Sequence, residues 1–207
     1  MQPTPSGFSV FEAETITLAD RRFLIRRATE SDVPGLAALL RDDALGASRE
    51  GSGAEEMAGY QHAFSLIDSD PNQLLVAVDE VTNDAESHGA ESHGAESHGA
   101  ESHGADAPQQ SPETRPAALV GTLQLTLIPS LSRRGSTRLQ IEAVRVGPNA
   151  QGLGLGTAVF DWAHDCGHRF GASLAQLTTD KSRADAQRFY ARLGYEASHE
   201  GLKRDLS

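Results

Sequence analysis

The sequence predicts a single α/β domain in which a mixed sheet carries helices on both faces. Segments of alternating apolar and polar residues, typical of strands, are interleaved with segments whose apolar residues recur every three or four positions, as in helices. A glycine-rich turn joins the strand expected at residues 139–146 to a helix. The chain has 207 residues, which suits one domain with a full core better than two.

The first part of the chain predicts two strands and two helices. Residues 1–17 have no regular pattern, so we expect a flexible segment there and the domain over 18–207. The elements expected next are a strand at 22–27, a helix cap at 29–32, a second helix at about 55–67 and a strand at 74–78. The first helix places four apolar residues on one face: Val33, Leu36, Ala37 and Leu40.

An acidic repeat interrupts the domain at about residues 80–116. The sequence Ala-Glu-Ser-His-Gly occurs four times from residue 85 to 104, and this period matches neither a helix nor a strand. Because the segment has almost no apolar residues, we predict a disordered insertion between two strands, which costs little closure entropy. A flexible chain gives the four histidines of the repeat no fixed geometry, although they could bind a metal. They are His88, His93, His98 and His103.

The second part of the chain predicts the remaining elements. They are a strand at 119–128, a loop at 129–137, strands at 139–146 and 174–179, a helix at 183–193 and a hairpin at 195–206. The helix after the glycine turn has four apolar residues at helical spacing: Val159, Ala163, Cys166 and Phe170. Ser182 and Asp185 have the spacing of a capping box.

The composition excludes several classes of function. The net charge is −11, but residues 79–113 hold nine acidic and no basic side chains, which leaves 20 acidic against 18 basic residues elsewhere. A domain so close to neutral does not suggest nucleic-acid binding. With the lone Cys166, no apolar leader-like run and no membrane-length run, we expect a cytoplasmic protein without membrane contact.

The histidines at 164 and 168 lie four residues apart around Cys166 and invite a metal interpretation. Cys166, however, belongs to the apolar face of the helix, and no third ligand is in view. His168 near the end of the helix is explained by the helix dipole. We therefore predict no metal.

The glycine-rich turn at residues 148–157 is typical of a site for a pyrophosphate. Glycines let the backbone approach an anion, and the N–H groups of the following helical turn bind phosphate oxygens. A Walker loop would need a lysine after Gly156, and a dinucleotide-binding turn would need a glycine at Thr157 and an acidic residue about 20 positions on. Both fit poorly, and a glycine-rich helix start without a ligand stays open.

Taken with residues 177–195, this turn resembles the GCN5-related N-acetyltransferase (GNAT) superfamily, as in its bacterial small-molecule branch. The order of elements is similar over residues 22–206, and the motifs lie within 139–195. The family pattern Gln/Arg-x-x-Gly-x-Gly/Ala keeps both glycines here, although Asn149 stands where a basic residue or glutamine is usual. Arg183 stands where relatives commonly have Asn, and a guanidinium also binds phosphate. The resemblance implies the GNAT fold and transfer of an acetyl group from acetyl-CoA to an amine.

Glu142 is the candidate general base. It lies in an otherwise apolar strand, where many members of the family have a glutamate that takes the proton of the ammonium group. A partly desolvated carboxylate suits this role. A salt bridge to Arg138 or Arg145 is the alternative, although a regular strand would put Arg145 on the opposite face.

Tyr190 is the candidate general acid, because it matches the tyrosine that lies near the thioester sulfur in relatives. A phenol is protonated at neutral pH and can donate to a thiolate. The alternative is an aromatic core residue beside Phe189. Tyr190 falls beside the apolar face formed by Ala186, Phe189 and Leu193, which favours a function.

The resemblance also implies the remaining binding residues. The acetyl-CoA set comprises the backbone of two strand residues, the glycine turn and one arginine: Val144, Val146, Gln151, Gly152, Leu153, Gly154, Gly156, Thr157 and Arg183. The acceptor pocket is expected at about 40–62 and 129–138. Glu55 and Glu56 could bind a cationic amine there, whereas Arg133, Arg134 and Arg138 could bind an anionic group of the acceptor.

The function predicted is an acetyl-CoA-dependent acyltransferase that acetylates a primary amine of a small molecule by direct transfer in a ternary complex. The arginines favour an amino-acid-like or phosphonate acceptor. Alternatives left open are acetylation of protein amino groups, a non-catalytic acetyl-CoA sensor and a homodimer joined through the C-terminal hairpin.

Overall fold

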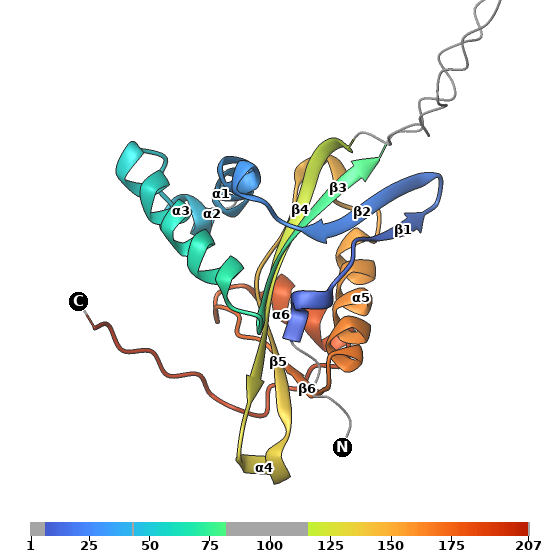
Figure 1. The fold of residues 1–207 in the computed structure, drawn as a ribbon, viewed down its shortest axis with the longest axis vertical. Coiled ribbons are helices and arrows are strands. Elements are labelled where there is room, and N and C mark those ends of the chain that lie inside the picture. The colour runs from blue at the N-terminus through green and yellow to red at the C-terminus, as the bar shows by residue number, and fades with distance from the viewer. Residues whose placement is uncertain (1–6, 43, 82–115, 207) are drawn as a thin grey trace, which may run out of the picture.

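The sheet has six strands in the order β1-β2-β3-β4-β5-β6, and all neighbours are antiparallel except β5 and β6 (Figure 1). The computed structural model describes residues 7–42, 44–81 and 116–206. The strands are β1 Glu14–Leu18, β2 Arg21–Arg27, β3 Gln73–Val81, β4 Pro116–Pro129, β5 Thr137–Val146 and β6 Ala172–Gln176. The helices are α1 Val33–Arg41, α2 Ala44–Ala47, α3 Ala54–Ser69, α4 Ser132–Gly135, α5 Leu155–Arg169 and α6 Ala184–Arg192, and short 3-10 turns occupy Gly7–Val10, Glu30–Asp32 and Pro148–Ala150.

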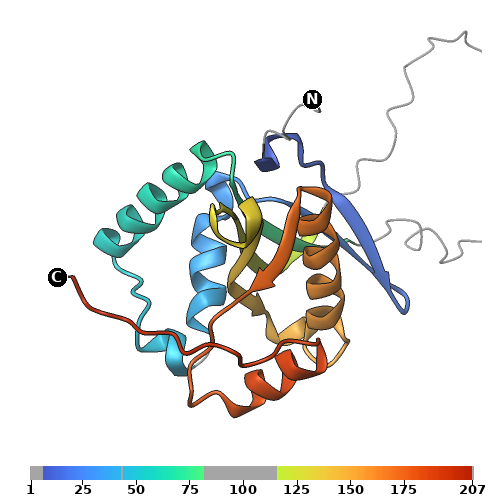
Figure 2. The same cartoon turned by 90° about the horizontal axis from the view of Figure 1, so that it is seen from below.

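Helices cover both faces of this sheet, as predicted (Figure 2). Helices α5 and α6 pack on one face over the larger apolar core, in which the α5 residues Val159, Ala163 and Cys166 are at most 3% exposed. Helices α1 and α3 lie on the other face, where Leu36 packs near Ala77. The predicted mixed α/β architecture is confirmed.

The predicted cap at residues 29–32 is confirmed and belongs to a larger polar network. Asp32 accepts hydrogen bonds from the backbone N–H and the hydroxyl of Thr29, and α1 follows directly. Arg26 of β2 binds both oxygens of Asp32 and also Asp79 of β3, which is 2% exposed. The cap therefore ties α1 to two strands.

The N-terminal segment is more regular than expected. We predicted no regular structure over 1–17, and for residues 7–17 this is wrong: β1 pairs with β2, and Phe8 is fully buried. Its ring lies 5.0 Å from that of Phe170, and its carbonyl accepts a hydrogen bond from Arg27. A single buried aromatic ring carries no periodicity, which is why the pattern missed it.

The end of the chain is less regular than expected. Strand β6 ends at Gln176, three residues before the predicted end, and the described residues 195–206 contain no strand, so the predicted hairpin is wrong. This segment runs away from the domain in Figure 1, with Leu202 and Leu206 more than 90% exposed. The repeat predicted to be a disordered insertion lies almost wholly outside the described residues.

Candidate active site

Strands β5 and β6 separate part-way along their length. Their parallel pairing runs from Thr137 opposite Ala172 to Gln140 opposite Gln176, where β6 ends. Strand β5 continues for six more residues to Val146. Over those six residues no strand of the described chain covers the edge of β5 that faces β6. An uncovered edge offers backbone N–H and C=O groups to a ligand.

A β-bulge lies in this uncovered part of β5. Ala143 has a positive φ of 53°, and the register with β4 shifts between Thr122 and Gln124. Thr122 and Gln124 share a face of β4 and pair with Arg145 and Glu142, so the bulge puts these two on one face as well. The expectation that Arg145 lies opposite Glu142 is therefore wrong, because it assumed a regular strand.

The Glu142 side chain is exposed, and among the described residues it forms no ion pair. The salt bridge considered as an alternative, to Arg138 or Arg145, is thus not formed within the described chain. Arg145 instead donates to the carbonyl of Val144 at 2.8 Å. The carboxylate of Glu142 is left accessible to a substrate.

The glycine turn follows β5 and leads into α5. Gly152 and Gly154 have φ values of 78° and 81°, and a Cβ built on either would meet no heavy atom within 4 Å. The left-handed backbone and the open space around it fit the close approach of a ligand. Gly154 caps α5 with no side-chain hydrogen bond, and the first helical bond is donated by Ala158 to Gly154. The three N–H groups before Ala158 therefore have no partner within the helix and suit a phosphate.

Two side chains fix this turn to the sheet. Arg21 of β2 binds Glu80 at 2.6 Å and reaches the carbonyl of Asn149 at 3.3 Å. Gln151 donates from its amide to the carbonyl of Val146 at 3.0 Å. Both contacts hold the turn beside the uncovered end of β5, so anion-binding groups and strand edge form one continuous surface.

Tyr190 lies within an aromatic cluster on the face covered by α5 and α6. Its ring is 5.6 Å from Phe160, 5.5 Å from Phe189 and 6.0 Å from Tyr195. The hydroxyl of Tyr195 bonds His164 at 2.8 Å, whereas that of Tyr190 has no hydrogen-bond partner among the described residues. Burial raises the pKa of Tyr190 in spite of the nearby arginines at 145 and 183, so the phenol stays protonated at neutral pH. The ring thus packs in the core, as the alternative expected, while the hydroxyl remains available to a ligand.

The start of α6 differs from the prediction. The hydroxyl of Ser182 donates to Asp180 at 2.6 Å, and Asp185 binds Arg188, so no capping box forms between Ser182 and Asp185. Arg183 is the N-cap residue, without a side-chain cap bond. An Asx-type turn at Asp180 uses the serine instead.

Glu142 and Tyr190 lie on opposite sides of the sheet. Val144 and Val146 pack against the same core as Tyr190, on the α5 and α6 face. Glu142 pairs with Gln124, whose neighbour Leu75 packs under α1 and α3 on the other face. The part of β5 that β6 leaves unpaired lies between these two sides.

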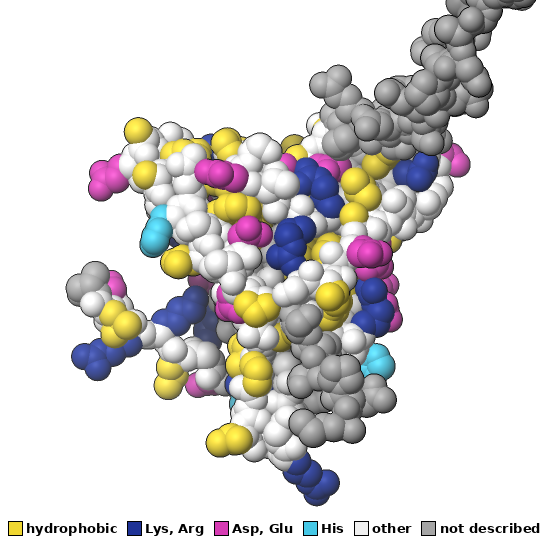
Figure 3. All heavy atoms as spheres, in the orientation of Figure 1, with side chains coloured by type: hydrophobic (Ala, Val, Ile, Leu, Met, Phe, Trp, Pro, Cys, Tyr) yellow, Lys and Arg dark blue, Asp and Glu magenta, His cyan; other side chains and the backbone are white. Residues whose placement is uncertain are grey.

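Apart from Arg138, the candidate acceptor residues are not gathered near Glu142. Arg133 and Arg134 are exposed and lie at the tip of the β4–β5 hairpin, with φ values of 52° and 62°. Figure 3 shows basic side chains at that tip, at the lower end of the molecule, whereas the glycine turn follows the other end of β5. Glu55 and Glu56 are exposed in the first turn of α3, and the carboxylate of Glu56 turns back toward Gly53. Arg138, also predicted to bind an anionic group, does lie on the same face of β5 as Glu142, together with Gln140, which the prediction missed.

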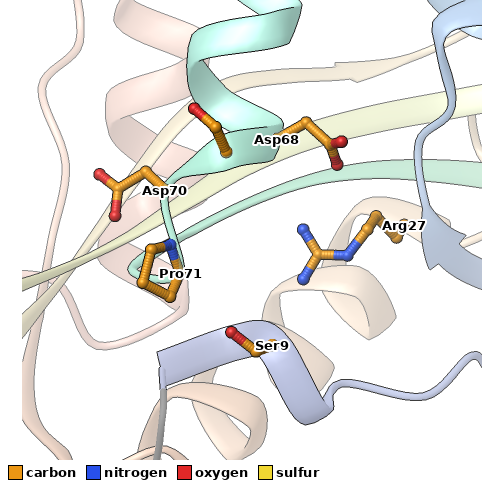
Figure 4. Close-up of a pocket in the computed structure, with 6 residues that line it drawn as sticks. Ser9, Arg27, Asp68, Asp70 and Pro71 are labelled. Carbon is orange, nitrogen blue, oxygen red and sulfur yellow. The ribbon is translucent and has the colours of Figure 1, made fainter.

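A shallow hollow lies elsewhere, between the first 3-10 turn and the end of α3 (Figure 4). It is lined by Ser9, Arg27, Asp68, Ser69, Asp70 and Pro71. Arg27 already binds the carbonyls of Phe8 and Gln73. Gln73 is the first residue of β3, whereas the glycine turn lies near the last residues of this strand. The hollow is therefore remote from the glycine turn.

No metal cluster was found within the parts of the chain that the structure describes. Burial raises the pKa of Cys166 to about 12, and His164 is occupied by Tyr195. The four histidines of the repeat lie outside the described residues. In residues 7–42, 44–81 and 116–206, no helix combines the length and apolarity that crossing a membrane requires.

The family model described as "Acetyltransferase (GNAT) family" matches residues 77–195. The chain belongs to the GNAT acetyltransferase family. Members of this family use acetyl-CoA, which agrees with an anion-binding turn beside an uncovered strand edge. The match includes both Glu142 and Tyr190.

Individual relatives support the family and the fold. The aminoalkylphosphonate N-acetyltransferase of Salmonella typhimurium is 38% identical over 60 residues, so the match spans 29% of this GNAT chain and 39% of that relative. A structure described as a transcriptional regulator from Bacillus halodurans has 35% identity and a TM-score of 0.67, over 88% of this chain and 98% of its own. A predicted acetyltransferase from Clostridium acetobutylicum, solved with acetyl-CoA, has a TM-score of 0.55 at 13% identity, over 89% and 96% of the two chains, and shows the fold alone.

Proposed function

We propose that this GNAT protein transfers the acetyl group of acetyl-CoA directly to a primary amine of a small molecule. The observation that carries the proposal is the uncovered end of β5, with the glycine turn at its end, Glu142 on one face and the Tyr190 hydroxyl on the other. This arrangement offers a phosphate site, a backbone edge, a base and an acid around one opening.

Acetyl-CoA would supply a thioester, and the chain would hold it in two places. The turn would bind the pyrophosphate through its backbone N–H groups, and the edge of β5 would bind the pantetheine arm. The residues proposed for this role are Val144, Val146, Gln151, Gly152, Leu153, Gly154, Gly156, Thr157 and Arg183. The Gln151 amide, which now donates to the carbonyl of Val146, would turn toward the ligand when that carbonyl is used.

Glu142 and Tyr190 would move the two protons of the reaction. Glu142 takes a proton from the ammonium group, directly or through a water, so that the nitrogen can attack the thioester carbon. A C–N bond forms, the C–S bond breaks, and Tyr190 would donate its proton to the departing thiolate. The second proton that the nitrogen then loses would return to the phenolate of Tyr190 through solvent, and the proton on Glu142 would leave to solvent. A backbone N–H near Val144 would stabilise the oxyanion.

The acceptor is proposed to be a small amine because the Salmonella relative carries an aminoalkylphosphonate acetyltransferase activity by name. We place the activity in a single domain, with the repeat at about 80–116 as an insertion outside its core. A protein amino group as acceptor, a homodimer and a non-catalytic acetyl-CoA sensor remain the competing proposals. The sensor is considered because the relative from Bacillus halodurans is described as a transcriptional regulator.

Titration calorimetry with acetyl-CoA tests the cofactor site. In a Gly154→Trp variant the side chain would fill the open space at the turn, so binding should be lost. Gly171 is a matched control, because it has a φ of 87°, also has nothing within 4 Å and lies after the other end of α5. A Gly171→Trp variant carries the same backbone strain and should bind acetyl-CoA normally.

The result separates the cofactor site from a general effect on folding. If neither the unchanged protein nor the control binds acetyl-CoA at millimolar concentration, the transferase proposal is wrong. If Gly154→Trp still binds acetyl-CoA, the glycine turn does not bind the pyrophosphate.

A further inference from the structure

A row of polar side chains crosses the face of the sheet that carries Glu142. Gln73, Thr126, Gln140 and Gln176 stand directly opposite one another on β3, β4, β5 and β6. Gln176 donates to Gln140 at 2.7 Å, and Thr126 donates to Gln73 at 3.4 Å. A sheet face that packs only against helices is apolar, so a row of amides and a hydroxyl indicates a face that meets polar molecules.

The helix over this face leaves it accessible. Among its described residues, α3 has no buried side chain, and its apolar stripe of Met57, Tyr60, Phe64 and Ile67 is only partly covered. Leu174 of β6, next to the polar row, is 36% exposed. The open part of the face is therefore the part over β5 and β6, where Glu142 lies.

Arg138 stands in this open part without a counterion. It pairs with Ile128 on one side and Leu174 on the other, and no carboxylate of the described chain binds it. Its Nε atom is buried and has no hydrogen-bond partner. The polar row ends two strands away at Gln73, whose amide donates to Asp70 at 3.5 Å. A buried guanidinium N–H without an acceptor is costly, unless a ligand supplies one.

A second polar atom beside Arg138 lacks a partner. Ser136 precedes it by two residues in extended backbone, so both side chains leave the chain on the same face. The hydroxyl of Ser136 is also buried without a hydrogen bond among the described residues. Gln140, two residues after Arg138, accepts from Gln176 through its oxygen, which leaves its amide N–H groups to donate. Three donors thus lie in a row on one face of β5, with Arg138 in the middle.

We propose that Arg138, with Ser136 and Gln140, binds an anionic group of the acceptor whose amine is acetylated near Glu142. The proposal rests on the proposed function and names the class of acceptor: an amine that carries a carboxylate, phosphate or phosphonate. Arg138 and Glu142 lie four residues apart on one strand, about 13 Å between Cα atoms at the usual rise. With the lengths of the two side chains subtracted, this spacing suits an acceptor with only a few atoms between its amine and its anion.

Three amines of equal chain length test this class. They are 3-aminopropanoate, 2-aminoethylphosphonate and the neutral 3-aminopropan-1-ol, each assayed by thiol release with the full-length protein at saturating acetyl-CoA. We expect a lower KM for at least one anionic amine than for the alcohol, and the two anionic probes distinguish a carboxylate from a phosphonate acceptor. An Arg138→Gln variant should raise that KM about 10- to 100-fold, as expected for loss of a charge-assisted hydrogen bond. The KM of the alcohol should change little, and Arg138→Lys should recover part of the loss.

The matched control is Arg188→Gln, which removes one positive charge from an exposed pair on α6. It should leave the preference for anionic amines unchanged. Equal KM values for the three amines, or an unchanged preference in Arg138→Gln, would overturn the proposal. If Arg134→Gln, rather than Arg138→Gln, loses the preference for anionic amines, the anion binds at the hairpin tip, and the proposal is overturned as well.

A binding measurement separates this proposal from the proposed function. The same amines are titrated onto the protein saturated with CoA, with no turnover required. Weaker binding of an anionic amine to Arg138→Gln than to the unchanged protein supports the anion site even if no amine is acetylated. Binding that Arg138→Gln does not weaken rejects the site even if acetylation occurs.

Discussion

Removing Arg26 is expected to lower the free energy of unfolding by about 3–5 kcal/mol at neutral pH. Its guanidinium lies 2.6 Å from Asp79 and 2.6 and 2.8 Å from the two oxygens of Asp32. The Asp79 side chain is 3% exposed. In an Arg26→Met variant this carboxylate stays buried without a partner, which costs much more than replacing both partners by apolar groups.

Part of this magnitude follows from Asp32. Hydrogen bonds, first from Arg26 and then from Thr29, lower the pKa of Asp32 from 3.8 to about 2, in a side chain that is 14% exposed. One pKa unit corresponds to about 1.4 kcal/mol, so losing the shift removes about 2 kcal/mol. The remainder comes from the isolated charge of Asp79.

Because of Asp32 and Asp79, the loss of unfolding free energy in Arg26→Met depends on pH. Burial already raises the pKa of Asp79, and the loss of Arg26 raises it further, so the folded variant binds a proton more tightly than the unfolded chain. The stability of the variant therefore rises as the pH falls from 7 to 5, and the deficit narrows. In the unchanged protein, the stability that the lowered pKa of Asp32 contributes is present above about pH 4 and is lost toward pH 2.

Urea unfolding followed by the fluorescence of Trp162, which is 7% exposed and the single tryptophan, measures this change. The control is Arg169→Met, because Arg169 binds Glu14 at 2.7 Å but is 43% exposed. Its removal should cost less than about 1 kcal/mol. Equal losses in the two variants, or a deficit for Arg26→Met that grows toward pH 5, would refute the reasoning.

Three further outcomes are expected. Tyr190→Phe keeps the ring contacts and should lower kcat about 10²–10⁴-fold with unchanged acetyl-CoA affinity by calorimetry, whereas a sensor would show no turnover to lose. Glu142→Gln should lower kcat/KM by a similar factor and recover partly at high pH, where more amine is neutral, and a pH-rate profile identical to that of the unchanged protein would exclude Glu142 as the base. Gly167→Ala puts a Cβ 2.6 Å from the buried Leu139 and should destabilise by about 1–3 kcal/mol in urea, while Gly59→Ala, in open space on α3, should stabilise by about 0.5–1 kcal/mol.

The sequence predicted the features of the site that depend on local pattern. The strand 139–146, the glycine turn and the apolar face of α5 are all present, because each is a run of residues whose character is set by near neighbours. The cap at 29–32 is likewise local.

Features that depend on contacts between distant segments were missed. The bulge at Ala143 contains no glycine that would have indicated it in the sequence. Because of this bulge, Arg145 lies on the same face as Glu142 and not on the opposite face, as expected. The isolation of Arg138 is a property of its cross-strand neighbours, Ile128 and Leu174, which no single segment of sequence reveals. The spacing of Ser182 and Asp185 fits a capping box, but Asp180 competes for the serine and forms the better local bond.

On the proposed function, the early end of β6 gives the cofactor and the acceptor two separate approaches to β5. Because β5 outlasts β6, its last six residues have no strand partner on the edge that faces β6. The glycine turn and Tyr190 lie on the side of α5 and α6, whereas Glu142 and Arg138 lie on the side of α1 and α3. On the proposed function, the cofactor and the acceptor then enter from opposite sides and meet at the opening. Neither has to leave before the other binds, which is the physical requirement for direct transfer in a ternary complex.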